Sequence, residues 1–395
     1  MLLFLPFGAT SGLVSVTIGY LAKQQGLGDA AIAGLVAINL FPHTFKFFWA
    51  PLPDTLLTRR RWYLLSNVVS SITLIMLGLV PVSEQSVTLL RMLIFTNSLA
   101  ITCLGMATEG LMANVVSAEE RGTASGWLQA GNLGGAGIGG GLALFLAQRL
   151  GSRAAFAVVA LLLLSCSLGL IGIQEPIRRV RLSLAASLRE VVLDLRDTII
   201  RSRTGLLAMI LCFLPIGSAA ASGLFAAIAG RWNTPADSVA LYTGVLAGLV
   251  AAAGCLAGGW VSDRMDRKRA YAVTGVFLAI IAIAMALGPH NEGGYAVFTL
   301  AYQFGSGLAY GAFTGFVLEA IGRGAVATKY NALASLSNIP IWYMTELDGR
   351  VSDRWGPDVM LFVDAATEIA GVAVFLTIAW LLLRGVRQGE AAEVH

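Results

Sequence analysis

The chain has 395 residues, of which 56% are hydrophobic and only 13% are charged, and its mean hydropathy is +0.75. Soluble domains carry about 25% charged residues, so this composition excludes an ordinary soluble protein and indicates a polytopic protein whose solvent is the lipid bilayer. The net charge of +4 does not indicate a nucleic-acid partner, because the basic residues fall in short gaps between apolar runs, as membrane topology signals do.

A membrane-spanning helix needs about 20 consecutive, mostly apolar residues. The first such run begins at the N-terminus without a basic stretch or a clear cleavage site, so we interpret it as a retained helix rather than a signal peptide. Twelve runs meet the criterion, and we predict an all-α integral membrane protein with spans at 2–22, 30–52, 62–82, 88–116, 122–148, 153–173, 204–230, 239–261, 270–288, 295–320, 330–347 and 358–383.

The longest gap between spans, residues 174–203, has apolar residues at helical spacing with arginines between them. This pattern is typical of an amphipathic helix that lies on a membrane surface. The gap divides the chain into an N-terminal six-helix bundle at 1–173 and a C-terminal six-helix bundle at 204–383, followed by a tail at 384–395. We therefore predict two bundles joined by one linker.

The distribution of basic residues sets the expected orientation. If both termini are cytoplasmic, the cytoplasmic gaps and the tail hold 19 of the 27 Lys and Arg residues, and the outer gaps hold six. The remaining two, Lys46 and Arg91, lie within predicted spans. The positive-inside rule therefore favours cytoplasmic termini and a cytoplasmic linker.

A short motif lies between the second and third spans of the second half, where residues 259–268 read GWVSDRMDRK. In the first half, an aspartate followed by an arginine cluster holds the same place. A carboxylate at a helix end can pair with loop arginines and with the positive N-terminus of a neighbouring helix, and can thereby hold one conformation of a transporter. Alternatively, these charges only set the topology. The candidate gating residues are Asp54, Arg59, Asp263, Arg264 and Arg267.

Two further strings receive a different interpretation. Residues 349–356 read GRVSDRWG and match the gating motif in sequence. Because the predicted topology places them in an outer loop, we interpret them as a chance match. The glycine-rich run at 131–141 contains a spacing found in nucleotide-binding loops, yet no strand precedes it. We expect it to allow a tight helix crossing in the fifth span.

Six plus six spans, a central loop and the 259–268 motif resemble the major facilitator superfamily. The string FKFFWAPLPD at 45–54 resembles a signature of its AmpG-type permeases and peptide–acetyl-CoA transporters, a branch that includes muropeptide and siderophore permeases. The segments at 117–122 and 327–333 look like the same branch. The resemblance implies the major facilitator fold and a proton-coupled secondary active transporter that works by alternating access. Such a protein would import an organic solute with anionic groups, such as a siderophore or an anhydro-muropeptide, across a bacterial inner membrane.

Several alternatives stay open. The solute could be another substrate of the same family, such as an acetyl-CoA-like compound, or a drug or metabolite for export. A membrane-embedded acyltransferase fits poorly, because of the three histidines only His43 lies in a span. A channel is disfavoured because two related halves indicate alternating access. We therefore expect a transporter and not an enzyme, without a cofactor or a metal. We expect it to be a monomer whose partners are a small organic solute and protons.

Polar residues within spans are the candidates for solute binding. Asn39, His43 and Lys46 are spaced i, i+4 and i+7, which predicts that they share one face of the second span and line a central cavity. There Lys46 would attract a carboxylate or phosphate; alternatively it extends to the inner interface and pairs with an acid. Other amides and aromatics can hold a large solute or merely bond neighbouring helices. These further candidates are Gln129, Asn132, Tyr302, Gln303, Asn338 and Trp342.

Acidic residues within spans are the candidates for proton coupling, since an ionisable group at membrane depth usually faces a cavity or a partner. Glu109 and Glu319 lie toward the cytoplasmic ends of corresponding spans in the two halves. Desolvation would favour their neutral form and suit them to carry a proton, although either can instead pair with an arginine near the inner surface. Asp364 and Glu368 share one face of span twelve. By the resemblance that span is peripheral, so we favour them less.

Overall fold

The computed structural model describes residues 1–49, 57–115, 121–173, 203–321 and 333–392, together with 189, 193 and 196. Within these residues the regular secondary structure is helical, and the helices form twelve rods in the predicted order. Seven of the described helices are long and apolar enough to cross a membrane, judged by length and composition alone. The predicted all-α architecture is therefore confirmed, whereas Asp54 and nearly all of the linker lie outside the described residues.

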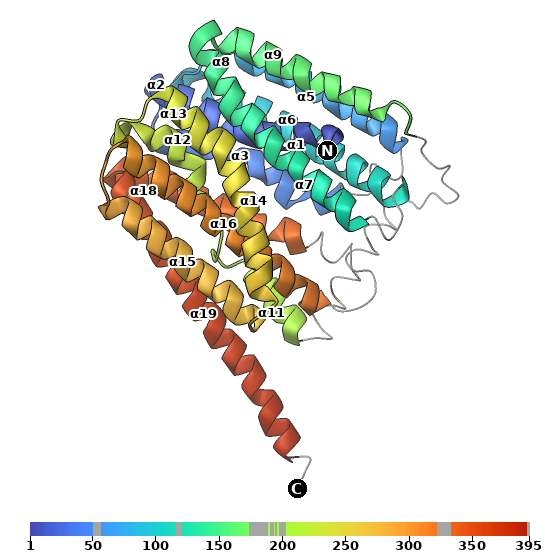
Figure 1. The fold of residues 1–395 in the computed structure, drawn as a ribbon, viewed down its shortest axis with the longest axis vertical. Coiled ribbons are helices and arrows are strands. Elements are labelled where there is room, and N and C mark those ends of the chain that lie inside the picture. The colour runs from blue at the N-terminus through green and yellow to red at the C-terminus, as the bar shows by residue number, and fades with distance from the viewer. Residues whose placement is uncertain are drawn as a thin grey trace.

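The first half of the chain supplies six rods (Figure 1). Two of them consist of two α-helices joined by a helical turn, at Leu13–Ile18 and at Ile138–Leu142. Short turns also precede α1 and α6 and follow α3 and α9. The α-helices are α1 (Leu5–Gly12), α2 (Gly19–Gln24), α3 (Asp29–Thr44), α5 (Arg59–Leu79), α6 (Val87–Val115), α7 (Arg121–Gly137), α8 (Ala143–Leu150) and α9 (Ser152–Ser165).

The second half supplies the other six rods. Helical turns at Ala220–Leu224 and Ala229–Trp232 flank α12, and a turn at Ala240–Val245 joins α13 to α14. Helix α19 runs beyond the predicted end of its span and projects from the bundle (Figure 1). The α-helices are α11 (Arg203–Leu211), α12 (Phe225–Ile228), α13 (Ala236–Val239), α14 (Leu246–Ser262), α15 (Arg267–Leu287), α16 (Glu292–Ile321), α18 (Asn338–Trp355) and α19 (Pro357–Ala392).

Two predicted spans are not regular helices throughout. Helix α3 contains Pro42 in its last turn and ends at Thr44, and a short turn follows at Lys46–Phe48 where the prediction had continued the span. The seventh span is broken at 212–219, between α11 and the next helical turn. This break contains Pro215 and two residues with positive φ, Gly217 at 67° and Ala219 at 50°. Irregular backbone at membrane depth is tolerated where protein groups satisfy it, so the break marks a region of special interest.

Span eleven differs from its prediction in the opposite direction. We predicted that it ends at residue 347, but α18 continues to Trp355. The acidic and basic residues in its last two turns had suggested an outer loop. In the structure, Asp348 and Ser352 are buried within this helix.

Glycines bring the rods of the first half into close contact. A Cβ atom on Gly135 would lie 2.0 Å from the backbone oxygen of Leu5, and one on Gly139 would lie 1.8 Å from that of Ala9. Helix α1 therefore packs against α7 and the turn at Ile138–Leu142 at backbone distance. The expected role of the run at 131–141 as a tight helix crossing is confirmed.

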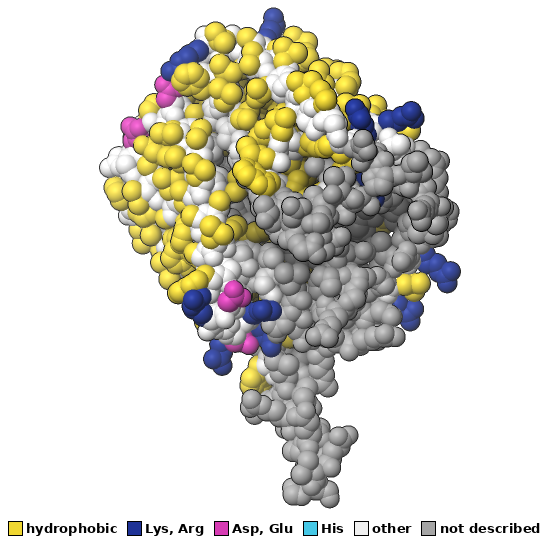
Figure 2. Space-filling model, turned by 45° about the vertical axis from the view of Figure 1, so that its right-hand side comes forward, with side chains coloured by type: hydrophobic (Ala, Val, Ile, Leu, Met, Phe, Trp, Pro, Cys, Tyr) yellow, Lys and Arg dark blue, Asp and Glu magenta, His cyan; other side chains and the backbone are white. Residues whose placement is uncertain are grey.

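The two halves meet along several pairs of elements, of which two have the most extensive contact. Helix α3 packs against α18, and the turn at Ile138–Leu142 packs against the turn at Ala240–Val245. Each half has its own apolar core, and a third cluster of buried apolar side chains spans both halves. The outer surface is rich in hydrophobic side chains, with Lys and Arg mainly near the ends of the helices (Figure 2). This surface suits a lipid environment.

Candidate functional site

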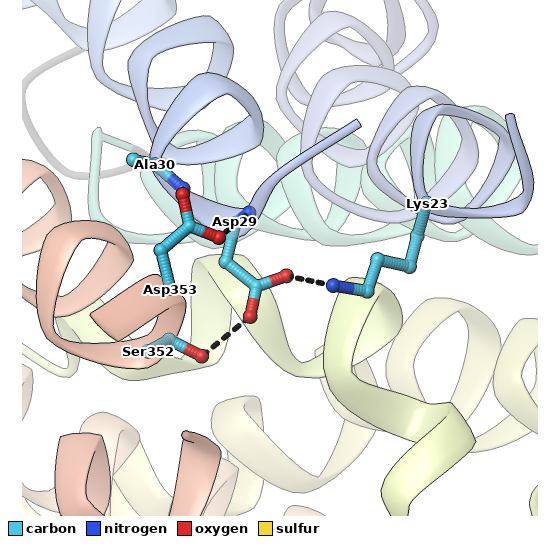
Figure 3. A network of polar contacts seen from close by, with 5 residues as sticks. All are labelled: Lys23, Asp29, Ala30, Ser352 and Asp353. Atoms are coloured by element: carbon cyan, nitrogen blue, oxygen red, sulfur yellow. Dashed lines mark hydrogen bonds and ion pairs between the residues drawn. The ribbon is translucent and has the colours of Figure 1, made fainter. Parts of the chain in front are cut away.

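A network of polar groups joins the two halves at the predicted outer end (Figure 3). The carboxylate of Asp353, on α18, accepts hydrogen bonds from the backbone N–H groups of Asp29 and Ala30, the latter at 2.9 Å. The carboxylate of Asp29 in turn accepts hydrogen bonds from Lys23 Nζ and from Ser352 Oγ, each at 2.6 Å. We call Lys23, Asp29, Ser352 and Asp353 the outer latch, because they connect the first half to the second.

The start of α3 explains why Asp353 binds there. The first N–H groups of a helix have no partner inside the helix and carry a partial positive charge, which favours a carboxylate nearby. Gly28 makes room, since a Cβ atom at this position would lie 2.8 Å from Asp353 Oδ2. Gly349 allows α18 to approach α3 closely, because a Cβ atom at this position would lie 2.1 Å from the Cβ atom of Ala33.

This finding revises the interpretation of the string at 349–356. We interpreted it as a chance match to the gating motif because it is predicted to lie outside. Its Asp353 nevertheless makes the contact that the motif's chemistry requires, a carboxylate on the N-terminus of a neighbouring helix. It does so at the end of the bundle opposite to Arg59 and Arg267.

A second bridge and a cavity lie at the same end. Arg149 of α8 forms a two-pronged ion pair with Asp237 of α13, with N–O distances of 3.0 and 3.1 Å. Both side chains are about half exposed, so this pair adds little by itself. Between the halves is a cavity of about 490 Å³, lined among others by Tyr20, Arg231 and the four residues of the outer latch.

The predicted gating residues show a correspondence between the halves. Arg59 begins α5 and donates a hydrogen bond to the backbone oxygen of Gly110 at 2.9 Å. Arg267 begins α15 and donates to the backbone oxygen of Gly315 at 3.3 Å. Both arginines therefore tie the third rod of their half to the fourth. Asp263 is exposed, and its role in gating stays a prediction.

The other residues of the gating motif have local partners. Arg264 lies over the ring of Trp260, 3.9 Å from its centroid, and donates to its backbone oxygen at 3.3 Å. Asp266, where the family motif has glycine, caps α15 by accepting a hydrogen bond from the N–H of Arg269 at 3.1 Å. Asp54 is outside the described residues, so the structure says nothing of its contacts.

The polar residues of the second span are only partly brought together. The side-chain oxygen of Asn39 is buried and has no hydrogen-bond partner among the described residues. His43 is partly buried, and its ring meets that of Phe7 edge-on, with centroids 5.0 Å apart. Lys46 lies in the turn after α3 and not on the same regular helix, and it forms no ion pair within the described part of the chain. The predicted shared helical face therefore ends at His43.

The remaining solute-binding candidates are distributed over several environments. Trp342 faces the first half, where its ring lies 6.2 Å from that of Phe41. The amide of Asn338 donates to carbonyl oxygens of its own chain segment, at 3.1 and 3.3 Å, which is a local role. Asn132 and Gln303 are partly buried. The side chain of Gln129 is outside the described part. None of these contacts tests binding, so the assignments stay predictions.

Tyr302 belongs to a different group of residues from the one we expected. It is fully buried and donates a hydrogen bond to Asp364 Oδ2 at 2.8 Å. Asp364 lies one helical turn before Glu368 on α19, and α18, which packs against α19, carries Asp348 close enough for the three charges to interact; we call these three residues the carboxyl cluster. Two acids one turn apart in an apolar span were a partial signal of this cluster. Asp348 was missed because its span was predicted to end one residue earlier.

The candidates for proton coupling lie elsewhere. Glu109 is partly buried on α6, next to the carbonyl group that Arg59 binds, and it forms no ion pair with a described residue. The side chain of Glu319 is outside the described part of α16. Their role in coupling therefore stays a prediction.

A bundle of helical rods with an apolar outer surface, joined across its halves by a polar network at one end, is the architecture of a polytopic membrane protein. The family model described as Major Facilitator Superfamily matches residues 1–341, and the chain belongs to this superfamily. The resemblance inferred from the sequence is thus confirmed, and with it the fold.

Among curated proteins, the chain is similar to the anhydromuropeptide permease of Escherichia coli (strain K12), with 23% identity over 400 residues that cover 95% of this chain and 78% of that protein. The permease of Escherichia coli O157:H7 matches to the same extent. Among solved structures, the D-xylose-proton symporter has a TM-score of 0.74 at 14% identity, covering 95% of both chains. The nucleoside transporter NupG has a TM-score of 0.73 at 12% identity, covering 95% of this chain and 97% of that one. These structural likenesses support the fold.

Proposed function

We propose that this chain is a proton-coupled secondary transporter that imports an organic solute with anionic groups across a bacterial inner membrane, with both termini in the cytoplasm. A siderophore and an anhydro-muropeptide are the two solutes that the family branch suggests. The single observation that carries the proposal is the outer latch, which joins the halves at one end through contacts that a separated pair of halves would lose.

The latch supports alternating access by its construction. Its bonds connect a helix N-terminus, a half-exposed lysine and two carboxylates, none of which needs covalent change to separate. The contacts of the exposed Asp353 and of the half-exposed Lys23 are individually weak, so water can replace them when the halves move, whereas the hydrogen bond between Ser352 and Asp29 is buried. In the form described here the outer end is held together, which is the form from which an imported solute would leave to the inside.

The anionic character of the solute rests on Lys46. Its side chain is only partly buried and forms no ion pair within the described residues, and it follows directly on the span that carries Asn39 and His43. A lysine at such a place can bind a carboxylate or a phosphate of a solute. The curated relative transports an anhydromuropeptide by its name, and such a peptide-bearing solute would present carboxylates to this lysine.

The proposal is tested by reconstituting the full chain in liposomes. Uptake is measured for two probes, a radioiron-labelled siderophore and a radiolabelled anhydro-muropeptide, under an imposed pH gradient and, separately, as counterflow without a gradient. We expect one probe to exchange in counterflow and to accumulate when the outside is acidic. Exchange without pH-driven accumulation would remove proton coupling from the proposal, and leakage of ions without exchange would indicate a channel.

A further inference from the structure

The carboxyl cluster in the second half is almost completely buried. Asp348 and Asp364 have no exposed surface, and Glu368 is 1% exposed. Four of their oxygen atoms have no hydrogen-bond partner in the described structure: both of Asp348, Oδ1 of Asp364 and Oε1 of Glu368. Unpaired acceptors of this kind are rare in protein interiors, because each forfeits the hydrogen bonds it would make to water.

Among the residues that the structure describes, the surroundings of the cluster supply hydrogen-bond donors and no positive charge. Tyr302 donates to Asp364, and the N–H of Gly217 donates to Glu368 Oε2 at 2.8 Å, with the amides of Ser218 and Ala219 also facing this carboxylate. The described titratable groups that act on the cluster are its own members and tyrosines, and none is a Lys, Arg or His. Full ionisation would therefore place three negative charges in one buried space, with no counter-ion from the described part of the chain.

The break in the seventh span is what brings amides to Glu368. Its positive-φ residues, Gly217 and Ala219, turn successive N–H groups toward one point, as in other anion-binding turns. The hydroxyl groups of Tyr271 and Tyr343 donate to backbone oxygens of the same break, at Ile216 and Phe213. The tyrosines are thus occupied in satisfying the broken backbone, and they leave the free carboxyl oxygens unpaired.

We propose that Asp348, Asp364 and Glu368 form the proton site of this transporter, in which at least one carboxyl group holds the transported proton. The inference rests on the proposed function, since it names the groups that perform its proton coupling. A shared proton removes the charge repulsion within the cluster, and it gives one unpaired oxygen an O–H that can bond to a neighbouring carboxylate. Release requires water to reach the cluster, and therefore a movement of α18 or α19.

The arrangement favours a proton over a metal cation. N–H and O–H groups point at two of the three carboxyl groups, and donors repel a cation that approaches the same oxygens. A proton needs only one free oxygen, and the cluster offers four. Broken helices that present backbone groups to ions are a known means of building coupling sites in transporters.

Two isosteric variants, Asp348→Asn and Glu368→Gln, test the site, with Glu84→Gln as control because Glu84 is an exposed carboxyl group away from the cluster. Infrared spectra of the purified full chain report protonated carboxyl groups through their C=O stretch, without any solute. At neutral pH we expect this band in the wild type and in Glu84→Gln, and a weaker band in both cluster variants. Absence of the band from the wild type, or equal bands in all four proteins, would overturn the proposal.

Transport then separates this inference from the proposed function. The assay uses the probe that the wild type exchanges. Both cluster variants should retain counterflow of this probe, but their pH-driven accumulation should fall to the level of protein-free liposomes. Intact pH-driven accumulation in both variants overturns the site while leaving proton coupling in place. Accumulation by the wild type only under a sodium gradient overturns both. If neither probe is transported, the solute assignment fails, and the infrared bands decide on the site.

Discussion

The outer latch makes a quantitative prediction about the balance between conformations. In Asp353→Asn the side chain keeps its size and one acceptor oxygen, but it loses its charge and turns an NH₂ group toward one of the two N–H groups at the start of α3. A charge at an exposed helix N-terminus contributes about 0.3–1 kcal/mol. Loss of one capping hydrogen bond adds about 1 kcal/mol. Because Asp353 is exposed, we use these surface values.

The sum of about 1–2 kcal/mol applies only to the joined form, since the separated form has no such contact. The ratio of separated to joined molecules should therefore rise by about 5- to 30-fold. The assay is a distance measurement between two spin labels in the full chain, on cysteines that replace Gln25 in the first half and Trp355 in the second, both exposed. The native cysteines are replaced beforehand. A long-distance population should grow in Asp353→Asn.

Two variants serve as controls for this measurement. Asp358→Asn removes a carboxylate at the same end that binds Arg231 at 2.7 Å and His290 at 2.9 Å, but all three residues belong to the second half, so the distance distribution should not change. In Gly349→Leu the new side chain would clash with Ala33 across the contact between α18 and α3. This variant should therefore populate the separated form of the two halves and serve as a reference for it. If that reference is resolved and Asp353→Asn still matches the wild type, the latch does not hold the halves together.

Two further predictions concern the solute and the helix crossing. Lys46→Ala should abolish uptake of the transported probe without loss of expression, and Lys46→Arg should retain part of it because the charge is kept; normal uptake in Lys46→Ala would remove this residue from the site. Gly139→Ala should lower the thermal unfolding temperature in detergent, because its Cβ would lie 1.8 Å from the oxygen of Ala9 and overpacking costs about 1–3 kcal/mol. Gly134→Ala is the matched control, since its Cβ would make an ordinary contact at 3.6 Å.

Features that depend on local patterns could be predicted from the sequence. The twelve rods follow from runs of apolar residues, because lipid requires each crossing to be a helix of sufficient length. The tight crossing at 131–141 follows from glycine spacing. The correspondence of Arg59 and Arg267 follows from their equal places after the second span of each half. In all of these, the signal and its consequence lie within one segment or in two equivalent ones.

Features that depend on contacts between distant segments could not be predicted. The latch pairs Asp353 with Asp29, which are more than 300 positions apart, so no spacing in the chain reveals it. Asp348 was assigned to a loop because charged residues end a hydropathy run, although a helix continues wherever its polar groups find partners. The break in the seventh span could not be predicted from hydropathy, because residues 212–219 are mostly apolar. The helix is nevertheless interrupted there by Pro215 and two residues with positive φ.

Helix α18 connects the carboxyl cluster to the outer latch. Asp348 points toward α19 and its two acids, whereas Ser352 and Asp353, about one turn further on, bind the start of α3. A helix is stiff over one turn, so a movement that admits water to Asp348 also displaces Asp353. We therefore predict that the protonation state of the cluster and the closure of the outer end are linked, so that each changes the equilibrium of the other.

The sign of this linkage can be worked out. The joined form keeps the cluster dry and so favours protonated carboxyl groups, whereas the separated form admits water and favours their ionisation. A state that binds more protons is stabilised when the pH falls, so raising the pH should increase the long-distance population of the Gln25–Trp355 label pair. In Asp348→Asn the increase with pH should be smaller, and an unchanged increase in that variant would contradict the linkage.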